Sequence, residues 1–213
     1  MKNYKTLLTQ KGETWQEALT RYERFLKADM LQYFTVKDYS YTFSENEAYL
    51  LHQDGKVLTR FIRNFSEEHN INVPDNLTDL MCNYGTFTVG DSLLEIFNQA
   101  DDTFMTLSEI LQSYNYDSLL AEIGPGMLKS LNGFYFFFGI SFPQTDQTSF
   151  LYFSKAGNFG IMHLSENNHE EALRKTLPSM FNGSIDKFTL DSLISNQIDR
   201  IIINALMVRG YID

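Results

Sequence analysis

Cysteine is nearly absent from this sequence, because Cys82 is the only one in 213 residues. A single cysteine excludes an intramolecular disulfide and any zinc site built from several thiolates. No run of apolar residues approaches the roughly 18 that a membrane-spanning helix needs. Residues 1–15 also lack the apolar stretch of a secretory signal peptide. We therefore expect a cytoplasmic protein without a membrane partner.

Positive charge is absent from residues 64–128. These 65 residues hold 11 Asp or Glu and no Lys or Arg, whereas residues 1–63 hold 10 Lys or Arg and residues 129–213 hold seven. A surface of this sign repels phosphates, so we expect neither nucleic acid nor an anionic membrane as a partner. It favours a basic protein partner, and the alternative is an acidic surface that only keeps the protein in solution.

Recognisable catalytic motifs are absent as well. None of the four histidines has H-x-x-x-H spacing, and His163 and His169 could meet only if the loop between them folds back. The Gly124–Gly126 segment lacks the lysine and the spacing of a nucleotide-binding loop, and no G-x-S-x-G elbow occurs. We therefore predict no catalytic residue, no metal site and no cofactor.

Aromatic residues, in contrast, are abundant and concentrated in residues 132–164. The alternation of bulky side chains predicts a half-buried strand that ends at Pro143. Two further strands, Phe150–Ser154 and Phe159–Leu164, flank a tight turn at residues 155–158, so the segment reads as a meander. One predicted face holds Phe134, Phe136, Phe138, Ile140 and Phe142, and the other holds Tyr135, Phe137, Gly139 and Ser141.

Periodicity and turn signals predict the remaining elements. Thr14 and Asp75 are the predicted N-caps of their helices, and Glu17 completes a capping box with Thr14. The predicted helices are 13–31, 76–84, 107–123, 168–181 (interrupted at Pro178) and 189–209, with a partly helical stretch at 46–65. The predicted extended segments are 33–43, 86–89 and 93–97.

These elements together indicate an α+β fold that contains the aromatic meander. The weakest boundary is residues 70–74, where the acidic segment begins. We therefore divide the chain into an N-terminal helix-plus-strand region, residues 1–70, and a main α+β domain, residues 71–213. Whether the first region packs on the second is left open by the sequence.

From about Val73 onward the chain resembles the SUKH superfamily. The residues that carry the resemblance are the helix-to-strand entry VPDNLTDLMCNYGTFTVGDSLLEIF and the paired strands NGFYFFFGISF and FLYFSKAGNFGIMHL. The bacterial members are largely immunity proteins, which bind a toxin and block it. The resemblance therefore implies an α+β fold, in which helices pack on an antiparallel or mixed sheet. It also implies no catalysis and a toxin domain as partner, with basic nucleases as one class of such toxins.

The acidic segment and the resemblance together lead to one hypothesis. We expect a non-enzymatic immunity protein that blocks its toxin through an acidic surface. The alternatives are a small-molecule-binding or hydrolytic domain with a site assembled from distant residues, and a general protein-interaction module. The predicted partner contacts are Asp91, Glu95, Asp101, Asp102 and Glu109, with Tyr114 and Tyr116 as aromatic anchors.

Overall fold

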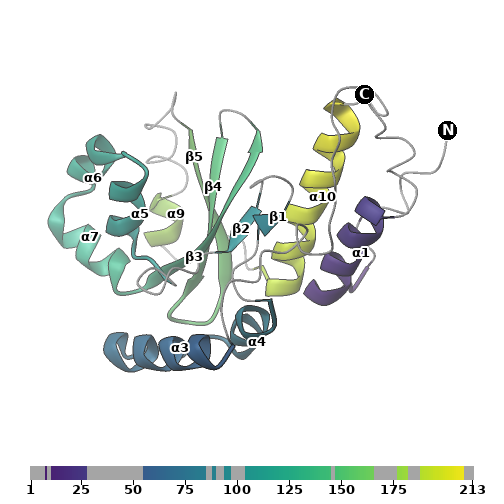
Figure 1. The fold of residues 1–213 in the computed structure, drawn as a ribbon. Helices are drawn as coiled ribbons and strands as arrows, with labels where there is room; N and C mark the ends of the chain where they lie inside the picture. The colour runs from purple at the N-terminus through teal and green to yellow at the C-terminus, as the bar shows by residue number, and fades with distance from the viewer. Residues whose placement is uncertain are drawn as a thin grey trace.

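The protein is built on a five-stranded sheet in the order β1-β2-β3-β4-β5, antiparallel at every pair (Figure 1). The predicted α+β class is confirmed. The computed structural model describes residues 8, 11–27, 55–84, 88–89, 94–96, 104–144, 147–165, 177–181 and 188–208. The strands are β1 (Thr88–Val89), β2 (Leu94–Ile96), β3 (Tyr135–Gln144), β4 (Gln147–Ser154) and β5 (Phe159–Ser165). The helices are α1 (Trp15–Lys27), α3 (Gly55–His69), α4 (Asp75–Tyr84), α5 (Leu107–Ser113), α6 (Asp117–Ile123), α7 (Pro125–Asn132), α9 (Leu177–Phe181) and α10 (Leu190–Val208).

Strands β3, β4 and β5 form the predicted aromatic meander. The turn between β4 and β5 places Gly157 at φ 80°, a backbone region that glycine enters without steric cost. The Ser154 amide donates to the Asn158 carbonyl at 2.8 Å and so closes the hairpin. The side chains of Phe136, Phe137 and Phe138 are fully buried, so the aromatic block is the interior of the molecule.

A bulge in β3 reverses part of the predicted alternation. Phe137 pairs with Tyr152 while Gly139 pairs with the preceding residue of β4, Leu151, so Phe138 is an extra residue in the ladder. One extra residue moves every later side chain to the opposite face. The prediction for Ile140 was therefore wrong, because Ile140 packs on the same side as Phe137.

The two ends of β3 also differ from the prediction. Phe134 lies outside the strand and is 39% exposed, so its assignment to the buried face was wrong. Pro143 does not end β3, which continues to Gln144.

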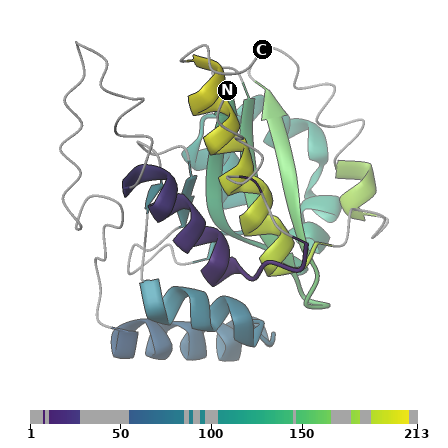
Figure 2. The same cartoon turned by 90° about the vertical axis from the view of Figure 1, so that its right-hand side faces the viewer.

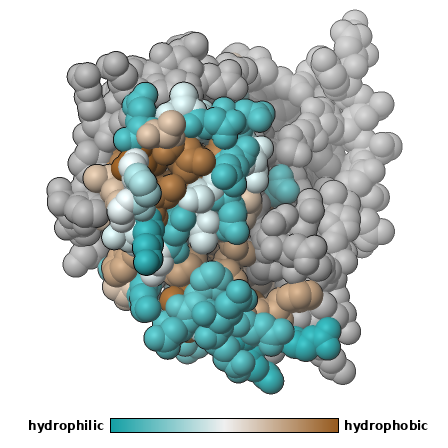
Figure 3. All heavy atoms as spheres, turned by 90° about the vertical axis from the view of Figure 1, so that its left-hand side faces the viewer, coloured by the Kyte–Doolittle hydropathy of each residue, from teal (hydrophilic) through white to brown (hydrophobic). Residues whose placement is uncertain are grey.

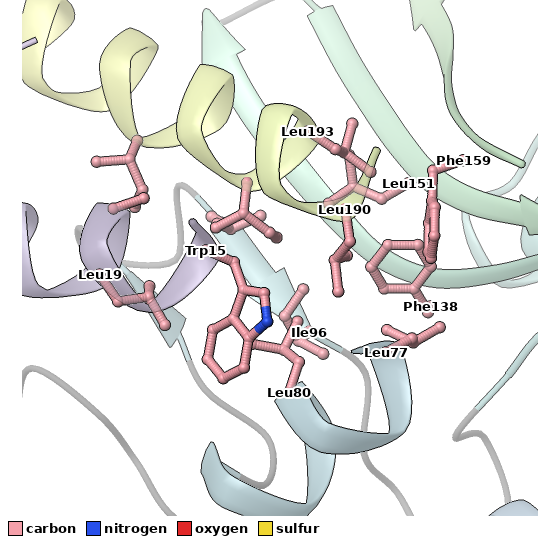
Figure 4. Close-up of a cluster of buried hydrophobic side chains, with 14 of the residues drawn as sticks. Trp15, Leu19, Leu77, Leu80, Ile96, Phe138, Leu151, Phe159, Leu190 and Leu193 are labelled. Carbon is pink, nitrogen blue, oxygen red and sulfur yellow. The ribbon is translucent and has the colours of Figure 1, made fainter. Parts of the chain in front are cut away.

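The sheet separates two hydrophobic clusters. The first, which we call core one, joins Phe136, Phe138 and Phe153 to α1, α4 and α10. Figure 4 shows it between α1, α4, α10 and the strands, with Trp15 beside Leu80 and Ile96. The second, core two, joins Phe137, Ile140 and Phe150 to α5, α6, α7 and α9. Figure 1 shows α1 and α10 on one side of the sheet and α5, α6, α7 and α9 on the other.

Helices α1 and α10 pack along one another over core one (Figure 2). The predicted capping box starts α1: the Thr14 amide donates to the Glu17 carboxylate at 2.8 Å, and the Glu17 amide donates to the Thr14 hydroxyl at 3.3 Å. Arg21 is buried and forms ion pairs with Glu13 and with Asp199 of α10, each at 2.8 Å. An apolar stripe and a buried charge network therefore join two helices at opposite ends of the chain.

Helices α3 and α4 pack together at one end of the sheet (Figure 1). Phe65 of α3 lies 5.0 Å from Phe104 and 5.5 Å from Phe136, measured between ring centroids. Helix α4 begins at Asp75, because the Pro74 carbonyl accepts from the amides of Leu77 and Thr78 at 3.0 Å. Pro74 rather than Asp75 is therefore the residue before the first helical turn, and the predicted N-cap was one residue late.

The predicted single helix over 107–123 is two helices. Asn115 between them has φ 61°, a left-handed conformation that asparagine tolerates better than most residues. The Tyr116 amide donates to the Leu111 carbonyl at 2.7 Å and closes the end of α5. The predicted end at Ile123 is confirmed, and Pro125 begins a further helix, α7, that was not predicted. Pro178 lies in the first turn of α9, where a missing amide hydrogen costs nothing.

Several predicted features lie outside the described residues. These are the strand at 33–43, residues 46–54 of the partly helical stretch, residues 28–31 and 168–176 of two helices, and the Gly85 that was expected to close α4. The predicted helix at 189–209 is confirmed as α10, and the short strands at 86–89 and 93–97 are confirmed in their described parts as β1 and β2. No described helix has both the length and the apolar character that spanning a membrane requires.

Candidate protein-binding surface

Three short helices, α5, α6 and α7, form a layer over core two. Asn132 at the end of α7 ties this layer together, because its side-chain oxygen accepts from the Ser108 amide at 3.1 Å and its amide nitrogen donates to the Ser108 hydroxyl at 2.6 Å. Leu107, Leu119 and Leu131, one from each helix, are buried against the sheet. The three helices are therefore anchored to the sheet through these buried side chains, and their opposite sides face outward.

Glu95 lies between Thr88 of β1 and three apolar residues in one cross-strand row. It pairs with Ile140 on β3, which pairs with Phe150 on β4, which pairs with Met162 on β5. Its neighbours Leu94 and Ile96 point into core one, so strand alternation directs Glu95 to the side of α5. The Glu95 side chain is half-buried there.

Tyr114 packs over the same row from the end of α5. Its ring meets the ring of Phe150 edge to face, with a centroid distance of 5.0 Å. Burial raises the pKa of Tyr114 to about 12, and the negative charge of Glu95 contributes to the increase. The structure therefore brings together Glu95 and Tyr114, two of the predicted partner contacts that are 19 positions apart in sequence.

Glu109 serves the helix on which it lies. It completes a capping box, in which its carboxylate accepts from the Thr106 amide at 2.6 Å and from the Thr106 hydroxyl at 2.7 Å. The T-x-x-E spacing at 106–109 is a sequence signal for this cap, and we read Glu109 only as a partner contact. The residue is exposed, so its negative charge still contributes to the field over α5.

Tyr116 does not suit the predicted role of aromatic anchor. Its side chain is 5% exposed and belongs to core two, so little of the ring is available to a partner. The remaining predicted contacts, Asp91, Asp101 and Asp102, lie outside the described residues.

The described carboxylates of residues 64–128 fall into two groups. Glu95, Glu109, Asp117 and Glu122 lie on or beside α5 and α6, and the last three are exposed. The second group is at the α3–α4 end of the molecule and consists of Glu67, Glu68, Asp75 and Asp79, all exposed. Arg60 and Arg63 are exposed on α3, so this end has mixed charge, whereas α5 and α6 carry acids only.

The side of the molecule formed by α5, α6 and α7 also carries apolar area. Viewed from that side, Figure 3 shows a hydrophobic area surrounded by hydrophilic residues, with the hydrophilic surface of α3 below it. Leu120 and Leu128 are partly buried against core two, and Met127 is 42% exposed. Apolar area within a polar rim is typical of protein-binding surfaces. We define the acidic face as Glu95, Glu109, Tyr114, Asp117 and Glu122.

A serine–histidine pair lies on the other side of the sheet. Ser149 Oγ is 2.8 Å from Nδ1 of His163, and these two residues are paired across β4 and β5. Burial and the positive charge of Arg200 lower the pKa of His163. Ser149 has no exposed surface, so its hydroxyl cannot reach a substrate, and the pair does not make a nucleophilic site.

Gln197 of α10 is a further buried polar residue that the sequence did not single out. It is fully buried, and neither its amide nitrogen nor its amide oxygen has a hydrogen-bond partner. Helical projection places it about 160° from Asp199, which pairs with α1, so Gln197 belongs to the side of α10 that faces away from α1. No group of three or more His, Cys, Asp or Glu suited to holding a metal occurs among the described residues.

Comparisons with protein-family models, with curated proteins and with solved structures found no match to this chain.

Proposed function

We propose that this protein binds a basic protein through its acidic face and blocks the activity of that protein by covering it. The observation that carries the proposal is the charge of α5 and α6. The described residues from 104 to 123 include three exposed carboxylates and no Lys or Arg, and Glu95 adds a fourth carboxylate beside them. A single-sign surface of this kind raises the rate of association with a partner of opposite charge.

The resemblance to SUKH immunity proteins supplies the class of partner. Immunity proteins bind a toxin and prevent it from acting, and many such toxins are basic nucleases, which suits an acidic face. Binding requires no catalytic group on this chain, because occlusion of the toxin is sufficient. The apolar area near α6 and α7 would supply desolvated contacts at the centre of the interface, and the carboxylates would supply the polar rim.

The proposal is tested by binding to the product of the gene that neighbours the gene of this chain. The purified proteins are mixed at about 0.1 M and at about 1 M salt, since the screening length falls from about 10 Å to about 3 Å over this range. We expect the association rate to fall steeply with salt while the dissociation rate changes less.

The triple variant E109Q/D117N/E122Q should show a slower association rate and a weaker salt dependence. Because E109Q also weakens the cap of α5, D117N/E122Q serves as the variant that leaves the cap intact.

A matched control is the double variant D75N/D79N, which removes two exposed carboxylates from α4 at the mixed-charge end. It should leave the association rate close to that of the original protein. Equal slowing in both sets of variants would show that net charge alone steers the partner. Tight binding that is insensitive to salt and to all of these substitutions would remove the acidic face from the proposal.

A further inference from the structure

The position of Glu95 is unusual for a carboxylate. Its row across the sheet continues with Ile140, Phe150 and Met162, all fully buried apolar side chains. A half-buried charge gains more from a cation than a fully exposed charge does. No hydrogen bond or ion pair joins the Glu95 carboxylate to any other residue that the structure describes.

Tyr114 provides the second half of the arrangement. The edge-to-face packing on Phe150 fixes the Tyr114 ring over the row, and the side chain is only partly buried. The capping bonds from the Tyr114 amide to the carbonyls of Ile110 and Gln112 fix its backbone at the end of α5. An aromatic face that is held in place beside a carboxylate is the arrangement that a guanidinium group recognises.

We propose that Glu95 and Tyr114 together hold an arginine side chain of the protein partner. The guanidinium donates two hydrogen bonds to the Glu95 carboxylate and stacks on the Tyr114 ring. Arginine is favoured over lysine, because its planar group satisfies the carboxylate and the ring at once and is more weakly hydrated than an ammonium. This inference rests on the proposed function and specifies one contact within it.

The test uses N-acetyl-arginine amide as the probe, with N-acetyl-lysine amide for comparison. Ring resonances of the tyrosines are followed by NMR during titration at about 0.1 M salt. The arginine probe should shift the Tyr114 ring resonances in a saturable way, and the lysine probe should bind at least about threefold more weakly. The variant E95Q should weaken the arginine response by about tenfold, since it removes the charge and keeps the shape.

Two further variants separate a specific contact from general attraction to an acidic surface. D79N removes an exposed carboxylate from α4, outside the acidic face, and should leave the Tyr114 response unchanged. Y114L should weaken binding through loss of the aromatic face, and hydrogen exchange on each variant would verify that α5 and β2 remain folded. An unchanged response in E95Q, an equal loss in D79N, or the absence of a saturable shift at Tyr114 would each overturn the inference.

The outcome is distinguishable from failure of the proposed function. If the basic protein partner binds with the expected salt dependence while the arginine probe leaves Tyr114 unaffected, the acidic face acts without this contact. If the probe binds at Glu95 and Tyr114 but D117N/E122Q leaves the partner's association rate unchanged, the contact stands and the steering role of α6 fails.

Discussion

The two sides of the sheet are built differently. Core one is covered by α1 and α10, which come from opposite ends of the chain and are joined by the buried Arg21 with Glu13 and Asp199. Core two is covered mainly by α5, α6 and α7, three short helices that follow one another within residues 107–132. The first side closes the fold through contacts distant in sequence. The second side is covered by one continuous stretch of chain. Its outward residues are under fewer structural constraints than the residues that join α1 to α10, so it can more easily carry a binding surface.

This comparison predicts that the largest losses of stability come from core one. The variant Phe138→Ala removes a fully buried ring at the bulge of β3 and should lower the free energy of unfolding by about 3–5 kcal/mol. Urea unfolding followed by circular dichroism measures the change. The fraction that remains folded should bind the partner normally, and loss of binding in fully folded protein would contradict the division between the two sides.

Removal of the buried cation should have the next largest effect. Arg21→Ala leaves Glu13 and Asp199 without their ion pairs in a buried environment and should cost about 3 kcal/mol of folding free energy. Arg24 is exposed on the same helix, so Arg24→Ala is the matched control and should change stability by less than about 0.5 kcal/mol. Similar, small losses in both variants would show that α1 is not anchored by this network.

A methyl group at Gly160 tests the packing of core two. A Cβ atom there would lie within 3 Å of the buried Tyr152 ring, which pairs with Gly160 across β4 and β5. Gly160→Ala should therefore cost about 1–3 kcal/mol through displacement of that ring. Gly126→Ala is the contrasting variant, since nothing lies near its Cβ position within α7, and it should stabilise the protein by up to about 1 kcal/mol.

His163 should make the stability of core one depend on pH. Burial and Arg200 lower the pKa of His163 in the folded protein, so the unfolded chain binds the proton more readily. Stability should therefore fall as the pH drops below the unfolded value of about 6.5, by no more than about 1.4 kcal/mol per pH unit. The slope difference between the original protein and His163→Gln, measured by urea unfolding between pH 5 and pH 8, isolates this residue. Identical slopes would contradict the assignment.

Local signals in the sequence predicted much of the fold. Turn residues and alternation defined the meander, and the 3.6-residue period defined α1 and α10. The bulge at Phe138 was missed because it depends on how β3 pairs with β4, and pairing is not visible within one strand. The break at Asn115 was missed because the apolar spacing continues through it. Helix α7 was missed because Pro125, which follows the end of α6, also suits the first turn of a new helix.

The candidate site was predictable only in part. The absence of cations from residues 64–128 is a signal in the composition. It led to the prediction of Glu95 and Tyr114 as partner contacts, but not to the prediction that they lie close together. Their proximity depends on the packing of α5 over β3 and β4, which spacing in the sequence does not encode. The burial of Tyr116 had no sequence signal, since Tyr114 and Tyr116 flank the same asparagine and only the helix break decides which ring turns inward.

The central claim is that the side carrying α5 and α6 binds the partner while the side carrying α1 and α10 closes the fold. Hydrogen exchange of this chain, alone and with the product of the neighbouring gene, tests that claim most directly. We predict slower exchange on binding in residues 94–96 and 107–123, with no change in residues 15–27 and 190–208. Slower exchange confined to α1 and α10 would contradict the account.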